Sequence, residues 1–186
     1  MGVRLERDSD RVSVRAVHLA AFGDHGNVVV DLADDLRGAV AKGEGFSLVA
    51  EEGDEVVGHA MFTPSLLDAP QQLVEVQVLS PVGVLPVWQK RGIGSAMIRR
   101  GLEILIERKV PIVFAEGPPQ YYSRFGFEAG AAQGFRKPSL RIPDAAFQAL
   151  RLPASEPWMS GTLVYSATFW RHDAVWLRNR DEHPRA

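Results

Sequence analysis

The spacing of apolar residues changes along the chain, and each spacing predicts an element. Apolar positions recur at intervals of three and four within residues 12–22 and again within 28–40, which predicts two amphipathic helices. Two apolar, β-rich runs at 46–50 and 56–62 flank a short Gly-Asp turn, which predicts a hairpin. Val3 and Leu5 predict a short strand before the first helix.

The middle of the chain predicts a strand, a helix and a second strand. Residues 73–85 alternate and then become continuously apolar, as in a central strand. Apolar residues at helical spacing from Met97 to Ile106, with charged residues between them, predict a helix that packs one face on a sheet. Residues 110–115 form another buried run, parallel to the central strand if this helix is a right-handed crossover.

Prolines predict where several elements end. We expect Pro64 to end the second hairpin strand and residues 63–72 to form a loop. Ser80-Pro81 interrupts the central strand and predicts a bulge, where a missing N–H does no harm. Pro143 suits the first turn of a helical stretch at 144–150, and residues 161–166 predict a final strand.

A basic, glycine-punctuated turn joins the central strand to the helix. Its sequence is Gln89-Lys90-Arg91-Gly92-Ile93-Gly94-Ser95. Two glycines let the backbone lie close to a ligand, and the first turn of a helix has unpaired N–H groups that favour a phosphate. The turn completes neither the P-loop pattern nor the Rossmann fingerprint.

This turn resembles motif A of the GNAT N-acetyltransferase superfamily. The family pattern, [QR]-x-x-G-x-[GA] after a strand often ending in Val-x-Pro, is matched by 89–94 after Val84-Leu85-Pro86. About 28 residues later, 121–127 (Tyr-Tyr-Ser-Arg-Phe-Gly-Phe) resembles the family's Y-x-x-x-G-F signature. A bacterial branch has Gly-Asp-Pro before this motif, whereas this chain has Gly117-Pro118-Pro119. Glu116 is then the nearby acid available to replace the missing carboxylate.

The resemblance implies a fold and a cofactor. The fold is the α/β (α+β) GNAT fold, with a mixed, mostly antiparallel central sheet, flanking helices and splayed central strands. In that fold the final strand inserts between the last two motif strands or pairs along their edge. The cofactor is acetyl-CoA, with backbone groups of Val82, Gly83 and Val84 on the pantetheine arm. The pyrophosphate would bind Gln89, Lys90, Arg91, Gly92, Ile93, Gly94 and Ser95.

The resemblance also implies a direct attack by a primary amine on the thioester. It gives Tyr122 the role of proton donor to the departing thiolate, and leaves Tyr121 as packing. For a general base we consider Glu75, whose alternative interpretation is a half-exposed strand residue, together with His59, Glu116 and His25. Catalysis by positioning alone, with water taking the proton, also fits the family.

Composition limits the other possibilities. The 186 residues are 46% hydrophobic, with 21 basic and 23 acidic residues and a formal charge of -2, so we expect no nucleic acid partner. The chain has no cysteine, and its five histidines show no close metal spacing, so we expect no metal. No apolar run approaches 18 residues, so we expect no membrane partner and a cytoplasmic protein.

We expect a single domain over residues 1–170 and a C-terminal tail over 171–186. The acceptor is a small-molecule amine or a protein or peptide amine, and acidic residues of the first two helices either contact it or form a solvated face. The tryptophans near the end suggest packing or a possible homodimer. Two competing functions are a non-catalytic acyl-CoA-binding sensor or interaction module, and a nucleotide-binding α/β protein of another kind.

Overall fold

The computed structural model describes residues 1–177. Its strands are β1 (Gly2–Leu5), β2 (Phe46–Glu52), β3 (Glu55–Asp68), β4 (Leu73–Val84), β5 (Ile112–Glu116), β6 (Glu128–Ala129), β7 (Phe135–Arg136), β8 (Phe147–Arg151) and β9 (Gly161–Val164). Its α-helices are α1 (Arg11–Phe22), α2 (Gly26–Ala41), α3 (Ile93–Glu107), α4 (Pro119–Tyr122) and α5 (Ala167–Arg171). Within this described part, no helix is long and apolar enough to cross a membrane.

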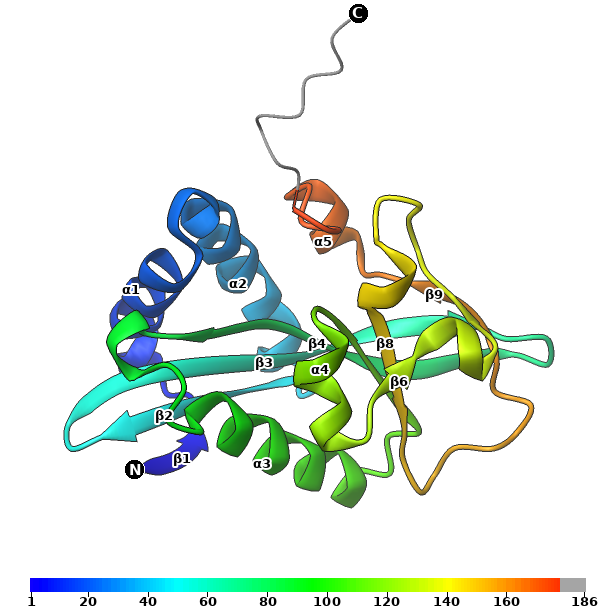
Figure 1. Cartoon of the computed structure of the whole chain (residues 1–186), viewed down its shortest axis with the longest axis horizontal. Coiled ribbons are helices and arrows are strands. Elements are labelled where there is room, and N and C mark those ends of the chain that lie inside the picture. The colour runs from blue at the N-terminus through cyan, green and yellow to red at the C-terminus, as the bar shows by residue number, and fades with distance from the viewer. Residues whose placement is uncertain (178–186) are drawn as a thin grey trace, which may run out of the picture.

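The strands form one mixed, mostly antiparallel sheet in the order β1-β2-β3-β4-β5-β8-β6, with β9 paired to β3 and β7. The parallel pair β4–β5 is joined by α3, as a crossover requires. Figure 1 shows α1, α2 and α5 on one face of the sheet and α3 on the other. The predicted fold class and the first strand, two helices, hairpin and crossover are therefore confirmed.

Each face of the sheet buries the apolar stripe of its helices. On one face, Met97, Ile98 and Leu105 of α3 belong to a cluster with Phe62 and Leu79 of the sheet, all at most 2% exposed. On the other face, α2 and α5 pack over a second cluster that includes Phe114 and Phe147. The helical spacing in the sequence thus reports the face that meets the sheet.

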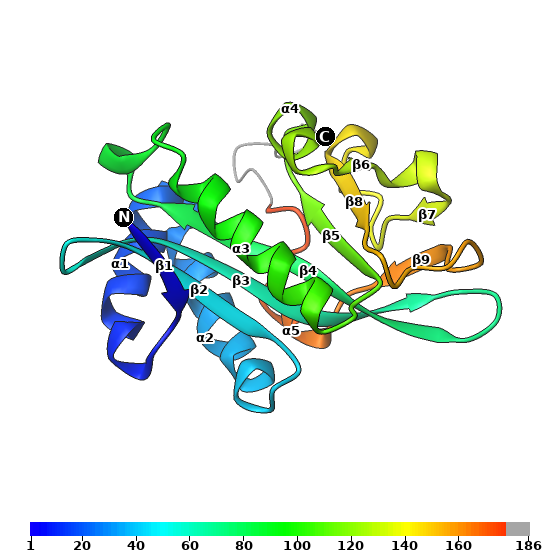
Figure 2. The same ribbon diagram turned by 90° about the horizontal axis from the view of Figure 1, so that it is seen from below.

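The two central strands separate where the site lies. β4 pairs with β5 from Gln77 to Leu79 and then continues along β3 alone to Val84. Ala60 pairs with Val82 while Phe62 pairs with Leu79, so β4 carries an extra residue at 80–81. The bulge predicted at Ser80-Pro81 is confirmed, and it bends β4 away from its neighbour. Figure 2 shows β4 and β5 diverging beside the start of α3.

The loop predicted over 63–72 is wrong, because β3 runs through Pro64 to Asp68. Pro64 lies beyond Phe62, the last β3 residue that pairs with β2, and before Leu66, the first that pairs with β9. At Pro64, β3 therefore has a neighbouring strand on one side only. The N–H that proline lacks removes no ladder bond from the side without a neighbour.

Two predictions for the last third are also wrong. Residues 144–150 form one 3₁₀ turn (Asp144–Ala146) followed by β8, which pairs along β5. Pairing to a buried strand overrides the local helical signal of Pro143. The final strand β9 pairs with β3 and β7, and it is β8 that takes the edge of β5.

The segment predicted as a tail from residue 171 is packed as far as the structure describes it. Val175 is fully buried in the core cluster beneath α5, and Trp176 packs against the same cluster. The rest of the predicted tail, 178–186, lies outside the described residues.

Candidate functional site

A cleft of about 530 Å³ opens between the end of β4, the start of α3 and α4. It is lined by Val82, Gly83, Val84, Trp88, Gln89, Lys90, Gly92, Ile93, Gly94, Ser95, Tyr121, Tyr122 and Arg124. All the residues predicted to bind the cofactor therefore line one cleft except Arg91. The guanidinium of Arg91 lies over the Trp88 ring instead, 4.7 Å from its centroid.

The glycine turn shapes the wall of this cleft. Gly92 caps α3 in the left-handed conformation, with φ of 84°, which a side chain would strain. A Cβ on Gly94 would lie 2.6 Å from the hydroxyl oxygen of Tyr121. The side-chain Nε2 of Gln89 donates to the backbone carbonyl of Val84 over 3.1 Å and connects the turn to β4. The first-turn N–H groups of α3 therefore face a space that no side chain of the turn fills.

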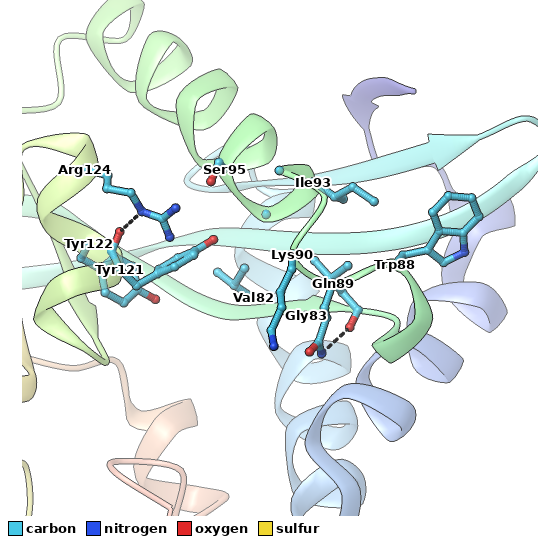
Figure 3. A pocket seen from close by; sticks show the side chains of 13 residues that line it. Val82, Gly83, Trp88, Gln89, Lys90, Ile93, Ser95, Tyr121, Tyr122 and Arg124 are labelled. Atoms are coloured by element: carbon cyan, nitrogen blue, oxygen red, sulfur yellow. Dashed lines mark hydrogen bonds between the residues drawn. The ribbon is translucent and has the colours of Figure 1, made fainter.

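Tyr121, Trp88 and Arg124 are cleft residues that the sequence did not reveal. Figure 3 shows the Tyr121 side chain reaching from α4 toward the start of α3. Its hydroxyl is hydrogen-bonded to the Ser95 side chain, which partly offsets the rise in pKa that burial causes. The Arg124 guanidinium lies 4.6 Å from the centroid of the Tyr121 ring. The Tyr-Tyr pair beside an arginine was a usable signal, but the sequence does not show which tyrosine faces which element.

A second cleft, of about 460 Å³, lies on the other side of Tyr122. It is lined by Phe22, His25, Val29, Leu32, Leu79, Ser80, Pro81, Val82, Glu116, Tyr122, Ala174, Trp176 and Leu177. Val82 and Tyr122 line both clefts. β4 thus lines both clefts, the second with its bulge at Ser80-Pro81 and the first with the residues after it, and the two clefts meet at a tyrosine.

Tyr122 is held at this junction by its neighbours. Its ring is packed at 5.5 Å from that of Phe127, and the residue is 7% exposed. A Cβ on Gly117 would lie 2.6 Å from Cε2 of Tyr122, so the glycine makes room for the ring. Burial, with the nearby Tyr121 and Glu116, raises the pKa of Tyr122 well above its usual value. The phenol is therefore protonated at neutral pH and can donate.

Glu116 is the carboxylate of the second cleft among the residues that the structure describes there. The Tyr165 hydroxyl donates to its Oε1. Burial raises the pKa of Glu116, and hydrogen bonds from Tyr165 and from the backbone of Trp176 lower it in part. A carboxylate offers about four acceptor positions, so these two bonds leave capacity for a ligand.

The other candidate bases lie differently. Glu75 is exposed on β4, pairs with Leu66 and lines neither cleft. His59 is fully buried and contacts His18 and Glu6, again outside both clefts. His25 does line the second cleft. Pro118 caps α4 and lines neither cleft.

Within residues 1–177, no group of three or more His, Asp or Glu side chains is placed to hold a metal ion. Among the described residues, the clefts offer hydrogen-bond donors, two tyrosines, one carboxylate and the imidazole of His25 as their chemical groups.

A family model of the acetyltransferase (GNAT) domain matches residues 3–130. The chain belongs to the GNAT acetyltransferase family. As a GNAT chain it is 32% identical over 133 residues to the uncharacterized N-acetyltransferase YjhQ of Escherichia coli K12, covering 70% of this chain and 71% of YjhQ. It is 29% identical over 154 residues to the uncharacterized N-acetyltransferase YhbS of the same strain, covering 82% and 87%.

Two solved GNAT structures resemble it closely in fold. The crystal structure of YhbS from Escherichia coli in complex with CoA has a TM-score of 0.79 and 26% identity, covering 91% of this chain and 92% of YhbS. A GNAT family acetyltransferase from Brucella melitensis in complex with acetyl-CoA has a TM-score of 0.71 and 33% identity, covering 90% and 97%. The family predicted from the two motifs is confirmed.

Proposed function

We propose that this GNAT protein transfers an acetyl group from acetyl-CoA to a primary amine by direct attack of the amine on the thioester. The observation that carries the proposal is the meeting of the two clefts at Val82 and Tyr122. One cleft suits the cofactor, the other suits an acceptor, and the junction suits the reacting carbonyl. Two relatives were crystallised with CoA or acetyl-CoA, which favours the same donor here.

The residues of the first cleft fit the cofactor. The N-terminus of α3, with Gly92, Gly94 and Ser95 at its start, provides backbone N–H groups and a partial positive charge for a pyrophosphate. Lys90 adds a positive charge on the cleft wall. Because β4 has no β5 partner beyond Leu79, its backbone at 82–84 is open on that side to pair with a pantetheine amide. We assign cofactor binding to Val82, Gly83, Val84, Gln89, Lys90, Gly92, Ile93, Gly94 and Ser95, and give Arg91 an indirect part through Trp88.

Bound acetyl-CoA supplies the activated acetyl group. Residues of the chain do the rest: they hold the two reactants together, which replaces a bimolecular encounter by an effectively intramolecular step. Tyr122 gives its proton to the leaving sulfur and regains one from the acylated nitrogen, which must lose a proton. A backbone N–H of β4 near Val82 polarises the carbonyl.

The absence of cysteine makes a clean assay possible. A thiol reagent reports released CoA alone, because the chain contributes no thiol. CoA release that depends on an added amine supports transfer. Tight acetyl-CoA binding with no release for any amine would instead favour the sensor function.

Cofactor binding is tested with charge at the start of α3. In calorimetric titration with acetyl-CoA, Ser95→Glu is expected to weaken binding by more than about tenfold, since a carboxylate would face the pyrophosphate. The matched Ser95→Gln loses the same hydrogen bond with Tyr121 without adding charge, and it is expected to bind more tightly than Ser95→Glu. Glutamate is favourable in the first turn of a helix, so both variants should fold. Equal affinity of the two variants, or no binding by the wild type, would refute the assignment.

A further inference from the structure

The second cleft combines one carboxylate with mostly apolar walls. We propose that Glu116 binds the ammonium of the acceptor and then takes its proton, and that the walls select an amine carried on an aromatic or branched apolar body. This inference rests on the proposed function and names its substrate class and its base.

The walls of the cleft are apolar on three sides. Phe22 of α1 and Leu32 of α2 face it from the helical layer, and Trp176 closes it after α5. Burying apolar ligand atoms against these side chains stabilises the complex, and a tryptophan provides a flat face for a ring. A volume of about 460 Å³ lies within the range of sites for small organic ligands.

The charges in and around the cleft favour a single ammonium. Among its described lining residues, Glu116 carries the one carboxylate and His25 the one imidazole. The nearby Arg141, which lowers the pKa of Glu116, is itself paired with Asp173 over 2.7 Å. A polyamine would have to bury further charges against Phe22 and Leu32 without partners, which is costly. A lysine side chain would present a thin methylene stem to walls that can cover a wider body.

Glu116 is positioned to act at the junction. It ends β5, immediately before Gly117, which packs against the Tyr122 ring. Tyr165 and the backbone of Trp176 hold the carboxylate, so its orientation is fixed. An amine at Glu116 therefore lies beside the residue that faces the cofactor cleft.

The protons balance in this scheme. The ammonium gives one proton to the Glu116 carboxylate and becomes nucleophilic. The nitrogen–carbon bond then forms as the carbon–sulfur bond breaks, and Tyr122 protonates the sulfur. The nitrogen loses its second proton, which replaces the proton that Tyr122 gave. Glu116 afterwards releases its proton to solvent.

The first test is an acceptor panel with acetyl-CoA, measured as CoA release. It contains 2-phenylethylamine and tryptamine, with spermidine and Nα-acetyl-lysine methylamide as the polycationic and peptide-like alternatives. We expect kcat/KM for the aromatic amines to exceed that for the other two by at least about tenfold. A preference for spermidine or the lysine compound would overturn the inference, and so would the absence of any turnover or binding of the aromatic amines.

The second test separates charge recognition from packing. Binding of 2-phenylethylamine and of its neutral isostere 2-phenylethanol is compared by calorimetry on the CoA complex. Wild type is expected to prefer the amine, and Glu116→Gln to lose that preference while its affinity for acetyl-CoA is unchanged. Trp176→Ala is expected to weaken both ligands alike. The exposed Glu128→Gln is the control and should behave as wild type.

The outcomes also distinguish this inference from the proposed function. If acetyl-CoA does not bind, the proposed function itself fails. If acetyl-CoA binds and an amine is acetylated, but Glu116→Gln keeps the amine preference and wild-type kcat/KM, then the inference alone fails.

Discussion

At the scale of single residues, the site depends on two adjacent tyrosines that face different elements. Tyr122 is buried against Phe127 and lines both clefts, whereas Tyr121 reaches the start of α3 and lines the first cleft alone. Their rings meet edge to face at 5.2 Å. Under the proposed function we therefore expect neighbouring positions on one short helix to serve different steps, one for chemistry and one for binding.

Removing each hydroxyl tests this division. Tyr122→Phe is expected to lower kcat by about 10²-fold, because the leaving sulfur loses its proton donor, while the Kd of acetyl-CoA stays unchanged. Tyr121→Phe is expected to weaken acetyl-CoA binding several-fold and to spare kcat, because it loses the bond to Ser95. Steady-state kinetics and calorimetry on both variants measure the two effects. An unchanged kcat in Tyr122→Phe would remove the tyrosine from the chemistry.

The sequence predicted the lining of the first cleft, residue by residue, better than that of the second. The glycine turn is a contiguous segment with its own backbone requirements, so 82–84 and 89–95 come together almost completely. Arg91 does not line that cleft, because a guanidinium can also stack on a neighbouring ring, here Trp88. Glu75 is far from the clefts because it precedes Val82 by seven residues on the same strand, a distance of about 23 Å. The second cleft joins segments distant in sequence, and no local pattern predicts that.

At the scale of elements, one glycine of α3 allows that helix to approach the sheet closely. Gly101 of α3 lies against Phe62 of β3, where an added Cβ would be 2.1 Å from Cζ of the ring. That ring is fully buried and stacked on Phe46 at 4.8 Å, so it has no room to move. Gly38 lies on the exposed side of α2, with nothing within 4 Å of the corresponding position. The same residue type therefore has a packing function in α3 and none in α2.

The same substitution is expected to change stability in opposite directions at these two glycines. Gly101→Ala should destabilise the protein by about 1–3 kcal/mol, since the extra methyl overpacks the core. Gly38→Ala should stabilise it by about 1 kcal/mol, because alanine favours a helix. Urea unfolding of both variants gives the free energies. Stabilisation by Gly101→Ala would mean that α3 can move off the sheet.

Element prediction succeeded where a local pattern and its surroundings agree. Helix α1 ends at Phe22, as the predicted span of 12–22 indicates, and β4 has its bulge at Ser80-Pro81. It failed where pairing partners decide. β3 continues through Pro64 because its pairing with β2 stops at Phe62. Residues 147–151 form a strand because they pair along the edge of β5. Neither circumstance is visible in the segment itself.

At the scale of the whole molecule, a buried network of polar side chains joins the N-terminal segment, helices α1 and α2, and the sheet. Nε2 of His18 in α1 lies 2.8 Å from Nδ1 of His59 in β3, and Nε2 of His59 lies 3.3 Å from Glu6. Glu6 also accepts from Ser47 and, over 2.6 Å, from Arg37 of α2. Both imidazoles are fully buried.

The charge of Glu6 determines which ring nitrogens of His59 and His18 carry a proton. Although burial opposes ionisation, hydrogen bonds from His59, Ser47 and Arg37 lower the pKa of Glu6 to about 2. An ionised carboxylate accepts only, so His59 donates through Nε2 and accepts at Nδ1 from Nε2 of His18. Nδ1 of His18 is then unprotonated, and it is buried without a hydrogen-bond partner in the described structure, next to Gly83. Both histidines are neutral in the folded protein.

This arrangement predicts acid destabilisation that begins near pH 6.5. Burial lowers the pKa of His18 from 6.5 to about 3 and also lowers the pKa of His59. As the pH falls below 6.5, the unfolded chain therefore binds protons that the folded chain does not. Stability is therefore complete above pH 6.5 and falls as pH falls, by roughly 1.4 kcal/mol per pH unit for His18, with a further loss from His59 and, below pH 4.5, from Glu6. His18→Gln keeps a donor for His59 but removes one titrating group. Urea unfolding between pH 8 and 5 should show the free-energy gap between wild type and this variant shrinking as pH falls. A gap that stays constant would mean that His18 is not held neutral by its burial.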